Sequence, residues 1–234
     1  MAGKLYLIPS PLAEGALAAI PAQVRRVLDG LDYILAENAR TTRRFLSALQ
    51  VSKPIDAYQL EEVDQSTSVE RVLELMNPVL AGRDVGLLSE AGCPGVADPG
   101  SLVVAYAHEL RLEVVPLVGP SSIVLALMAS GLHGQQFAFH GYLPIDKKQR
   151  DQEIKHLERE SLSRGQTQIF IEAPYRNEQL LRALQHACHP ETRLCVARDL
   201  TGAQELVRTL PIKKWKDQNL ALHKVPTIFL MNAR

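Results

Sequence analysis

The sequence has no excess charge, few cysteines and no long apolar run. Lysine plus arginine and aspartate plus glutamate both number 26, so no global positive field attracts nucleic acid, and such a partner would need a local basic patch. The three cysteines form no Cys-x-x-Cys pair, which fits a reducing compartment. The apolar start is too short for a signal peptide, and no run approaches the roughly 18 apolar residues of a membrane span. We therefore expect a cytoplasmic protein without a membrane partner.

Several common catalytic and cofactor motifs are also missing. Neither G-x-G-x-x-G nor G-x-x-x-x-G-K-[ST] occurs, which disfavours a dinucleotide site and a P-loop. The Gly-Pro-Ser-Ser segment is not a nucleophile elbow, because Ile123 stands where the second glycine is needed. The histidines and cysteines between residues 186 and 195 match no common zinc spacing, so we expect no metal.

Short apolar runs alternate with helical patterns, and 46% of the residues are hydrophobic, which allows a sizeable core. The alternation predicts an α/β fold with parallel strands and right-handed crossovers. The expected strands are 4–8, 33–36, 55–58, 85–88, 113–117, 137–140, 167–171, 193–197, 205–209 and 227–231. The expected helices are 21–31, 41–49, 68–76, 101–110, 121–130, a charged helix that ends near 164, and 177–186. A shift to polar, basic composition after Gly141 predicts two domains, 1–141 and 142–234.

The most distinctive stretch is a loop between strand 85–88 and helix 101–110. Residues 89–100 read Ser-Glu-Ala-Gly-Cys-Pro-Gly-Val-Ala-Asp-Pro-Gly. Glycine permits positive φ and close approach of a ligand, while proline fixes φ. Ligands of open α/β sheets bind beyond the carboxyl ends of the strands, so the loop is a candidate binding site, with a stiff connection as the alternative. A second such loop, 118–122, places Ser121 and Ser122 at a helix start, where free amides bind anions.

These loops carry few strong nucleophiles, so they would bind a ligand by backbone contacts and leave the reactivity to a cofactor. A cofactor-dependent transferase and a small-molecule binding module both fit. Arg40, Arg43 and Arg44 lie near the start of helix 41–49, the unfavourable end for cations. They indicate either an anionic partner or a solvated face. With Lys147, Lys148 and Arg150 they are candidates for a phosphate-binding patch.

Six motifs, in order along the chain, resemble those of the tetrapyrrole methylase superfamily. They are Ser-Glu-Ala-Gly-Cys-Pro-Gly-Val-Ala-Asp-Pro-Gly (89–100), Pro-Leu-Val-Gly-Pro-Ser-Ser (116–122), Ala-Ser-Gly-Leu (129–132), Gly-Tyr-Leu-Pro (141–144), Glu-Ala-Pro-Tyr-Arg (172–176) and Ala-Arg-Asp-Leu-Thr (197–201). The sequence is most similar to the ribosomal RNA small-subunit methyltransferase I branch, which methylates a cytidine 2′-hydroxyl. The resemblance implies a homodimer of two-domain α/β chains, with S-adenosylmethionine in the interdomain cleft and rRNA or the small ribosomal subunit as acceptor partner. A methyltransferase for a tetrapyrrole-like or other small molecule, and a catalytically degenerate S-adenosylmethionine-binding protein, are the alternatives.

The resemblance also implies roles for individual residues. The implied cofactor-binding residues are Pro11, Ser89, Glu90, Ala91, Gly92, Cys93, Val96, Ser121, Ser122, Glu172 and Leu200. The implied catalytic residues are Glu37, Arg40 and Asp98, where either carboxylate is a candidate base or an orienting group. The chain has Glu37-Asn38-Ala39-Arg40 where the rRNA branch usually has Glu-Asp-Thr-Arg, and Glu90 where the family has aspartate. These differences concern the acceptor substrate more than the cofactor.

Overall fold

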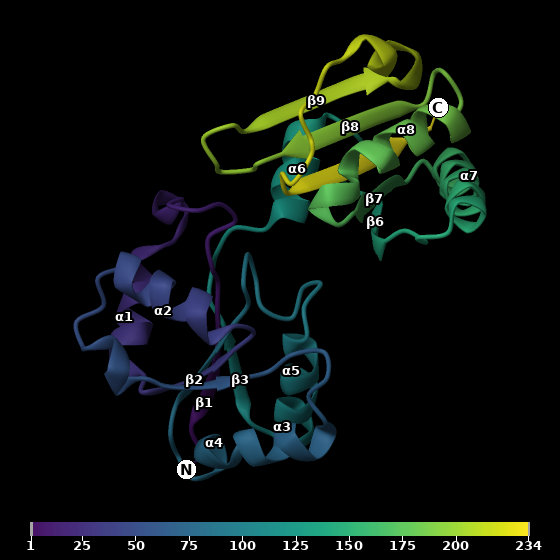
Figure 1. The fold of residues 1–234 in the computed structure, drawn as a ribbon. Coiled ribbons are helices and arrows are strands. Elements are labelled where there is room, and N and C mark those ends of the chain that lie inside the picture. The colour runs from purple at the N-terminus through teal and green to yellow at the C-terminus, as the bar shows by residue number, and fades with distance from the viewer. Residues whose placement is uncertain (1, 234) are drawn as a thin grey trace. The chain divides into compact units, whose positions relative to one another are not determined.

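The computed structural model describes residues 2–233, and its contacts divide the chain into two units between Ser121 and Ser122 (Figure 1). Each unit is built on one five-stranded sheet. The division precedes the boundary expected at 141/142, which would separate β6 (Phe137–Tyr142) from its partner β7 (Thr167–Ile171). Helix α6 (Ser122–Ser130) also contacts β8, β9 and β10 and so belongs with the later strands.

The sheet of the first unit is parallel throughout, as the alternation of strands and helices predicts, with strand order β3-β2-β4-β1-β5. Its strands are β1 (Lys4–Ile8), β2 (Tyr33–Ala36), β3 (Gln59–Glu62), β4 (Val85–Leu88) and β5 (Glu113–Pro116). Its helices are η1 (Leu17–Ala19), α1 (Ala22–Gly30), α2 (Ala39–Ala48), η2 (Ile55–Ala57), α3 (Val69–Leu75), α4 (Asn77–Leu80) and α5 (Gly100–Glu109).

Successive strand residues of this sheet point to opposite faces, so each face has its own core. Ile34 packs with the buried side of α1 and α2, whereas Leu35 packs with α3 and α5. Figure 1 shows α1 and α2 on one side of these strands and α3 and α5 on the other. The neighbouring strands β1 and β4 therefore continue to opposite faces of the sheet. Such a topological switch point is where open α/β sheets usually bind ligands.

The second unit has a mixed sheet with strand order β6-β7-β10-β8-β9. Only β6 and β7 pair in parallel; β10 (Thr227–Asn232) is antiparallel to β7 and β8 (Arg193–Arg198), and β9 (Leu206–Pro211) is antiparallel to β8. The remaining elements are α7 (Lys147–Arg164), η3 (Pro174–Arg176), α8 (Asn177–Ala187) and η4 (Ile212–Asp217). The core on the α7 and α8 face surrounds the fully buried Trp215, whose Nε1 donates to the Leu194 and Leu210 carbonyls at 3.2 and 3.1 Å.

One predicted strand is wrong and one helix was not predicted. Residues 55–57 form a 3₁₀ turn after Pro54, and the edge strand follows at 59–62. The unpredicted helix is α4, which has Pro78 in its first turn, where the missing N–H costs nothing. In the described range 2–233, no helix combines the length and apolar character needed to cross a bilayer.

Candidate functional site

Four loops of the first unit meet at one edge of its sheet, because all five strands run in the same direction. They follow β1, β2, β4 and β5 and contain most of the residues singled out from the sequence: Pro11, Glu37, Ser89, Glu90, Ala91, Gly92, Cys93, Val96, Asp98 and Ser121. Arg40 lies in the first turn of α2, directly after the loop that follows β2. The structure thus brings together, at the switch point, residues that lie up to 110 positions apart in the sequence.

The loops after β1 and β4 are tied to each other by backbone hydrogen bonds. Ser10 and Gly92 form an antiparallel bridge with N–H to oxygen distances of 2.8 and 3.0 Å. The buried Ser10 hydroxyl donates to the Ser89 carbonyl at 2.8 Å. The loop after β5 packs closely against the loop after β1, since a Cβ at Gly119 would lie 2.0 Å from the Pro9 side chain. Ser10 has no role in the expected site, although its place directly after β1 could have suggested one.

The loop after β4 has a backbone that few sequences adopt. Gly92 and Gly95 have φ values of 77° and 80°, and Ala97 has 60°. The Asp98 carboxylate holds this shape, because its Oδ1 accepts hydrogen bonds from Gly95 N at 2.7 Å and Gly100 N at 2.8 Å. Burial raises the pKa of Asp98 in spite of these bonds. Asp98 is therefore first of all a structural group of the loop.

The same loop has backbone donors that the protein does not use. No group in the described part of the chain accepts a hydrogen bond from the N–H of Ala91 or of Cys93, on either side of the bridged Gly92. Unused backbone donors next to a glycine-lined wall suit the carboxylate or other acceptor atoms of a ligand. The Cys93 thiol lies 3.4 Å from the Pro120 carbonyl, and burial raises its pKa, so it is not a reactive thiolate.

Glu37 follows β2 directly and is held against the loop after β4. Its backbone N–H donates to Leu88 O at 3.1 Å, and its side-chain Oε2 accepts from Glu90 N at 2.9 Å. Burial raises the pKa of Glu37, and the charges of Asp98 and Glu90 add to this. A carboxylate that binds its proton more tightly than usual is suited to act as a base.

Asn38 and Arg40 begin helix α2. The Asn38 side chain caps the helix by accepting from Arg40 N at 3.0 Å and Thr41 N at 3.2 Å. Arg40, Arg43 and Arg44 are exposed, and within residues 2–233 none of them forms an ion pair. An unpaired basic surface of this kind is available to an anionic partner.

Pro11 is half-buried in the loop after β1, and Val96 is 49% exposed at the tip of the loop after β4. Ser122 is the first residue of α6, so the predicted serine pair spans the division between the two units. Arg150 cannot join a surface patch with Lys147 and Lys148, because it lies on the buried side of α7 and is only 3% exposed.

Glu172 and Leu200 lie in the second unit, where they follow β7 and β8, two strands that run in the same direction on either side of β10. Glu172 is buried, and its Oε1 accepts from Arg176 Nε at 3.0 Å, from Arg176 Nη2 at 2.7 Å and from its neighbour's N–H, Ala173 N, at 2.7 Å. Leu200 is buried between two residues at positive φ, Asp199 and Thr201. The Arg176 partner was missed, although its i,i+4 spacing from Glu172 is a usable sequence signal.

Comparisons with known proteins place these motifs in context. Residues 4–215 match the family described as Tetrapyrrole (Corrin/Porphyrin) Methylases. Ribosomal RNA small subunit methyltransferase I of Synechocystis sp. is 34% identical over 87% of this chain and 69% of that protein. The protein of the same name from Vibrio cholerae is 33% identical over 89% of this chain and 68% of its own length.

Solved structures are similar in fold at much lower identity. The methyltransferase CobJ gives a TM-score of 0.66 at 16% identity, over 100% of this chain and 95% of that one. Uroporphyrin-III-C-methyltransferase from Thermus thermophilus gives 0.57 at 18% identity, over 99% of this chain and 93% of that one. At such identities the similarity concerns the fold, and it covers both α/β units.

Proposed function

The chain belongs to the tetrapyrrole methylase family, and from this premise we propose that it transfers a methyl group to the 2′-hydroxyl of a cytidine in small-subunit rRNA. One observation carries the proposal: over most of its length the chain is more than 30% identical to proteins named ribosomal RNA small subunit methyltransferase I. The position of Glu37 beside the glycine-rich loop supports it. We further propose that it acts in the cytoplasm as a homodimer. The exposed Met128 on the apolar helix α6 is available for such an association.

The methyl donor of this family is S-adenosylmethionine, which supplies an electrophilic methyl group on a sulfonium. The loops of the first unit fit this cofactor, because the unused N–H groups of Ala91 and Cys93 flank a buried, positive-φ Gly92. We assign cofactor binding to this loop together with Pro11 and the helix start at Ser122. A wall of backbone and small side chains also excludes water from a charged, reactive ligand.

We assign the base to Glu37 and a loop-holding role to Asp98. Both Asp98 hydrogen bonds maintain the loop, whereas no group of the described residues donates a hydrogen bond to the Oε1 of Glu37. A ribose hydroxyl is a poor nucleophile at neutral pH, so removal of its proton by a nearby carboxylate accelerates its attack. Arg40, together with Arg43 and Arg44, would bind RNA phosphates near the site.

The test combines titration calorimetry with S-adenosylmethionine and transfer of labelled methyl to 30S subunits from a strain that lacks the gene. We expect binding and label in 16S rRNA. An Arg40→Ala/Arg43→Ala/Arg44→Ala variant should raise KM for 30S subunits and leave cofactor affinity unchanged. Lys214→Ala/Lys216→Ala, which removes two exposed lysines of η4 in the second unit, is the matched control. If the protein binds S-adenosylmethionine but 16S rRNA takes up no label, the acceptor is not this rRNA, and a small-molecule acceptor or a sensor role takes its place. If the protein does not bind S-adenosylmethionine, the whole proposal is overturned.

A further inference from the structure

Two tyrosines of the second unit are exposed without an evident structural reason. Tyr142 and Tyr175 are each 63% exposed, whereas the other four tyrosines, all in the described range, are buried or half-buried. A large aromatic ring in water loses the free energy that its burial would contribute, so exposed rings often mark a binding surface. Both belong to family motifs, Gly-Tyr-Leu-Pro and Glu-Ala-Pro-Tyr-Arg, to which the proposed chemistry assigns no role for the tyrosine.

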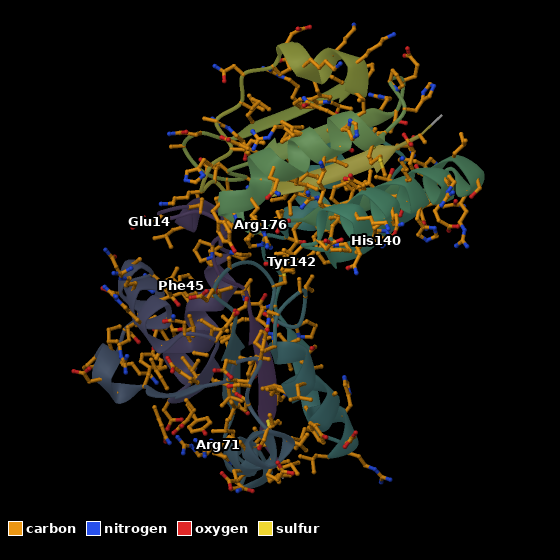
Figure 2. All side chains as sticks on the ribbon, turned by 45° about the vertical axis from the view of Figure 1, so that its right-hand side comes forward. Glu14, Phe45, Arg71, His140, Tyr142 and Arg176 are labelled. Carbon is orange, nitrogen blue, oxygen red and sulfur yellow. The ribbon has the colours of Figure 1, made fainter. Side chains whose placement is uncertain are left out.

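Both tyrosines lie at the same edge of the sheet. Tyr142 ends β6 and pairs with Ile171, the last residue of the parallel strand β7. Tyr175 follows in η3, four residues after Ile171. Figure 2 labels Tyr142 and Arg176, the residue next to Tyr175. The carboxyl edge of β6 and β7 thus carries two aromatic rings on neighbouring segments.

The position of Tyr142 depends on an irregularity of β6. The pairing of β6 with β7 shifts between Phe139 and Tyr142, where β6 contains one residue more than β7, and Gly141 has φ of 65°. A bulge with glycine in the left-handed region redirects the side chains that follow it, and bulges are frequent next to functional sites. This bulge therefore sets the direction in which Tyr142 leaves the sheet.

The Tyr175 ring lies beside a side chain that is fixed by hydrogen bonds. The Arg176 guanidinium lies 5.4 Å from the centre of the Tyr175 ring, and it is fixed by two hydrogen bonds to the buried Glu172. The turn is also tied to the segment before β10, because Lys224 N donates to Pro174 O at 3.0 Å. A ring on such a support loses little freedom when a planar group stacks on it.

We propose that Tyr142 and Tyr175 form a stacking platform for unpaired bases of the RNA acceptor. The inference rests on the proposed function, since proteins that recognise a particular RNA nucleotide usually bind unpaired segments, whose bases can stack on aromatic side chains. Base stacking on aromatic side chains tolerates sequence and needs an exposed π face, which both rings provide. Because Arg176 is already paired with Glu172, the two rings carry no net charge beside them, and the surface suits planar bases rather than phosphates.

The experiment compares 30S binding and methyl transfer for Tyr142→Ala, Tyr175→Ala, the double variant and the corresponding Phe variants. Phe137→Ala is the matched control, because this exposed ring lies at the opposite end of β6. We expect each Ala variant to raise KM and the 30S dissociation constant about tenfold, while the Phe variants and the control stay within about twofold of wild type. Affinity for S-adenosylmethionine, measured by calorimetry, should not change.

The outcomes separate the two proposals. If the wild type methylates 16S rRNA and the Ala variants keep its KM, the platform is overturned and the proposed function stands. If the Phe variants raise KM as much as the Ala variants do, the tyrosine hydroxyls rather than the rings bind the RNA, and the stacking platform is overturned. If the wild type neither binds nor methylates 30S subunits, both proposals fail. Loss of a protein partner in the Ala variants, with unchanged KM, would instead identify a protein-docking surface and also overturn the platform.

Discussion

Glu37 and Glu172 occupy equivalent places in the two units, since each directly follows a buried strand at the carboxyl edge of its sheet. Their surroundings differ. Glu37 has the carboxylates of Glu90 and Asp98 for neighbours and no cation, and its pKa is raised. Glu172 has the Arg176 guanidinium, which neutralises it. The same residue type thus has a raised pKa in one unit, which fits the base proposed there, and holds a turn through an ion pair in the other.

The two loops that accompany these glutamates differ in the same way. The first unit combines glycines, unused backbone donors and half-buried carboxylates, which suits a charged ligand. The second combines an ion pair with exposed aromatic rings, which suits a planar ligand. Fold similarity alone would not distinguish these edges, because function depends on the side chains that each edge carries.

We expect the largest effect from substitution of Glu37, on the rate of methyl transfer. Glu37→Gln should lower kcat for methyl transfer by about 100-fold or more, because the amide cannot accept the hydroxyl proton. Since the pKa of Glu37 is raised, the acid limb of the wild-type pH profile should lie above the range of an ordinary glutamate, and the variant should lack this limb. Glu109→Gln, on the exposed side of α5, is the control. An unchanged kcat would show that Glu37 is not the base.

The free energy of unfolding should respond differently to a Glu→Gln substitution in the two units. Folded Glu37 binds its proton more tightly than the unfolded chain does, so its ionised form costs stability above the unfolded pKa, and Glu37→Gln should leave the neutral-pH free energy of unfolding unchanged or higher. Glu172→Gln leaves the Arg176 guanidinium without its charge partner and should lower that free energy by about 2 kcal/mol. Urea unfolding of both variants measures the difference. Equal losses would contradict the comparison.

Gly119→Ala should loosen the loops of the first unit without affecting the second. The added Cβ would lie 2.0 Å from Pro9, so the loops after β1 and β5 must move apart, at a cost of about 1.5 kcal/mol. Thermal unfolding and calorimetry with S-adenosylmethionine should show a lower Tm and weaker binding. Gly134→Ala is the control, since a Cβ there meets nothing within 4 Å. Cofactor affinity equal to that of wild type would mean that these loops do not shape the site.

Much of the fold could be predicted from local pattern, and the failures have physical reasons. Continuous apolar runs such as 33–36 and 85–88 identify buried strands, because a central strand that is covered on both faces buries every side chain. The edge strand β3, Gln-Leu-Glu-Glu, is half-exposed and has no such run. The direction of β10 depends on the connection through η4, which local pattern does not describe.

The site could be predicted only in part. Glycines and prolines identified the loop after β4, because their backbone preferences are local. The hydrogen bond from Glu90 N to Glu37 and the burial of Arg150 depend on which segments meet in three dimensions. Arg150 illustrates this, since a basic residue in a charged helix is normally exposed, yet it packs on the buried side of α7.

The smallest effect is expected at Asn38, where the chain departs from the usual aspartate of the rRNA branch. Asn38 Oδ1 accepts from two backbone N–H groups of α2, as an aspartate would. Asn38→Ala should therefore lower the free energy of unfolding by about 1 kcal/mol. Asn38→Asp keeps the cap and adds a favourable negative charge at the helix start, so stability should be equal or slightly higher. If Asn38→Asp instead changes kcat by more than tenfold at unchanged stability, position 38 takes part in the chemistry, and the acid–base assignment to Glu37 alone must be extended to its neighbour.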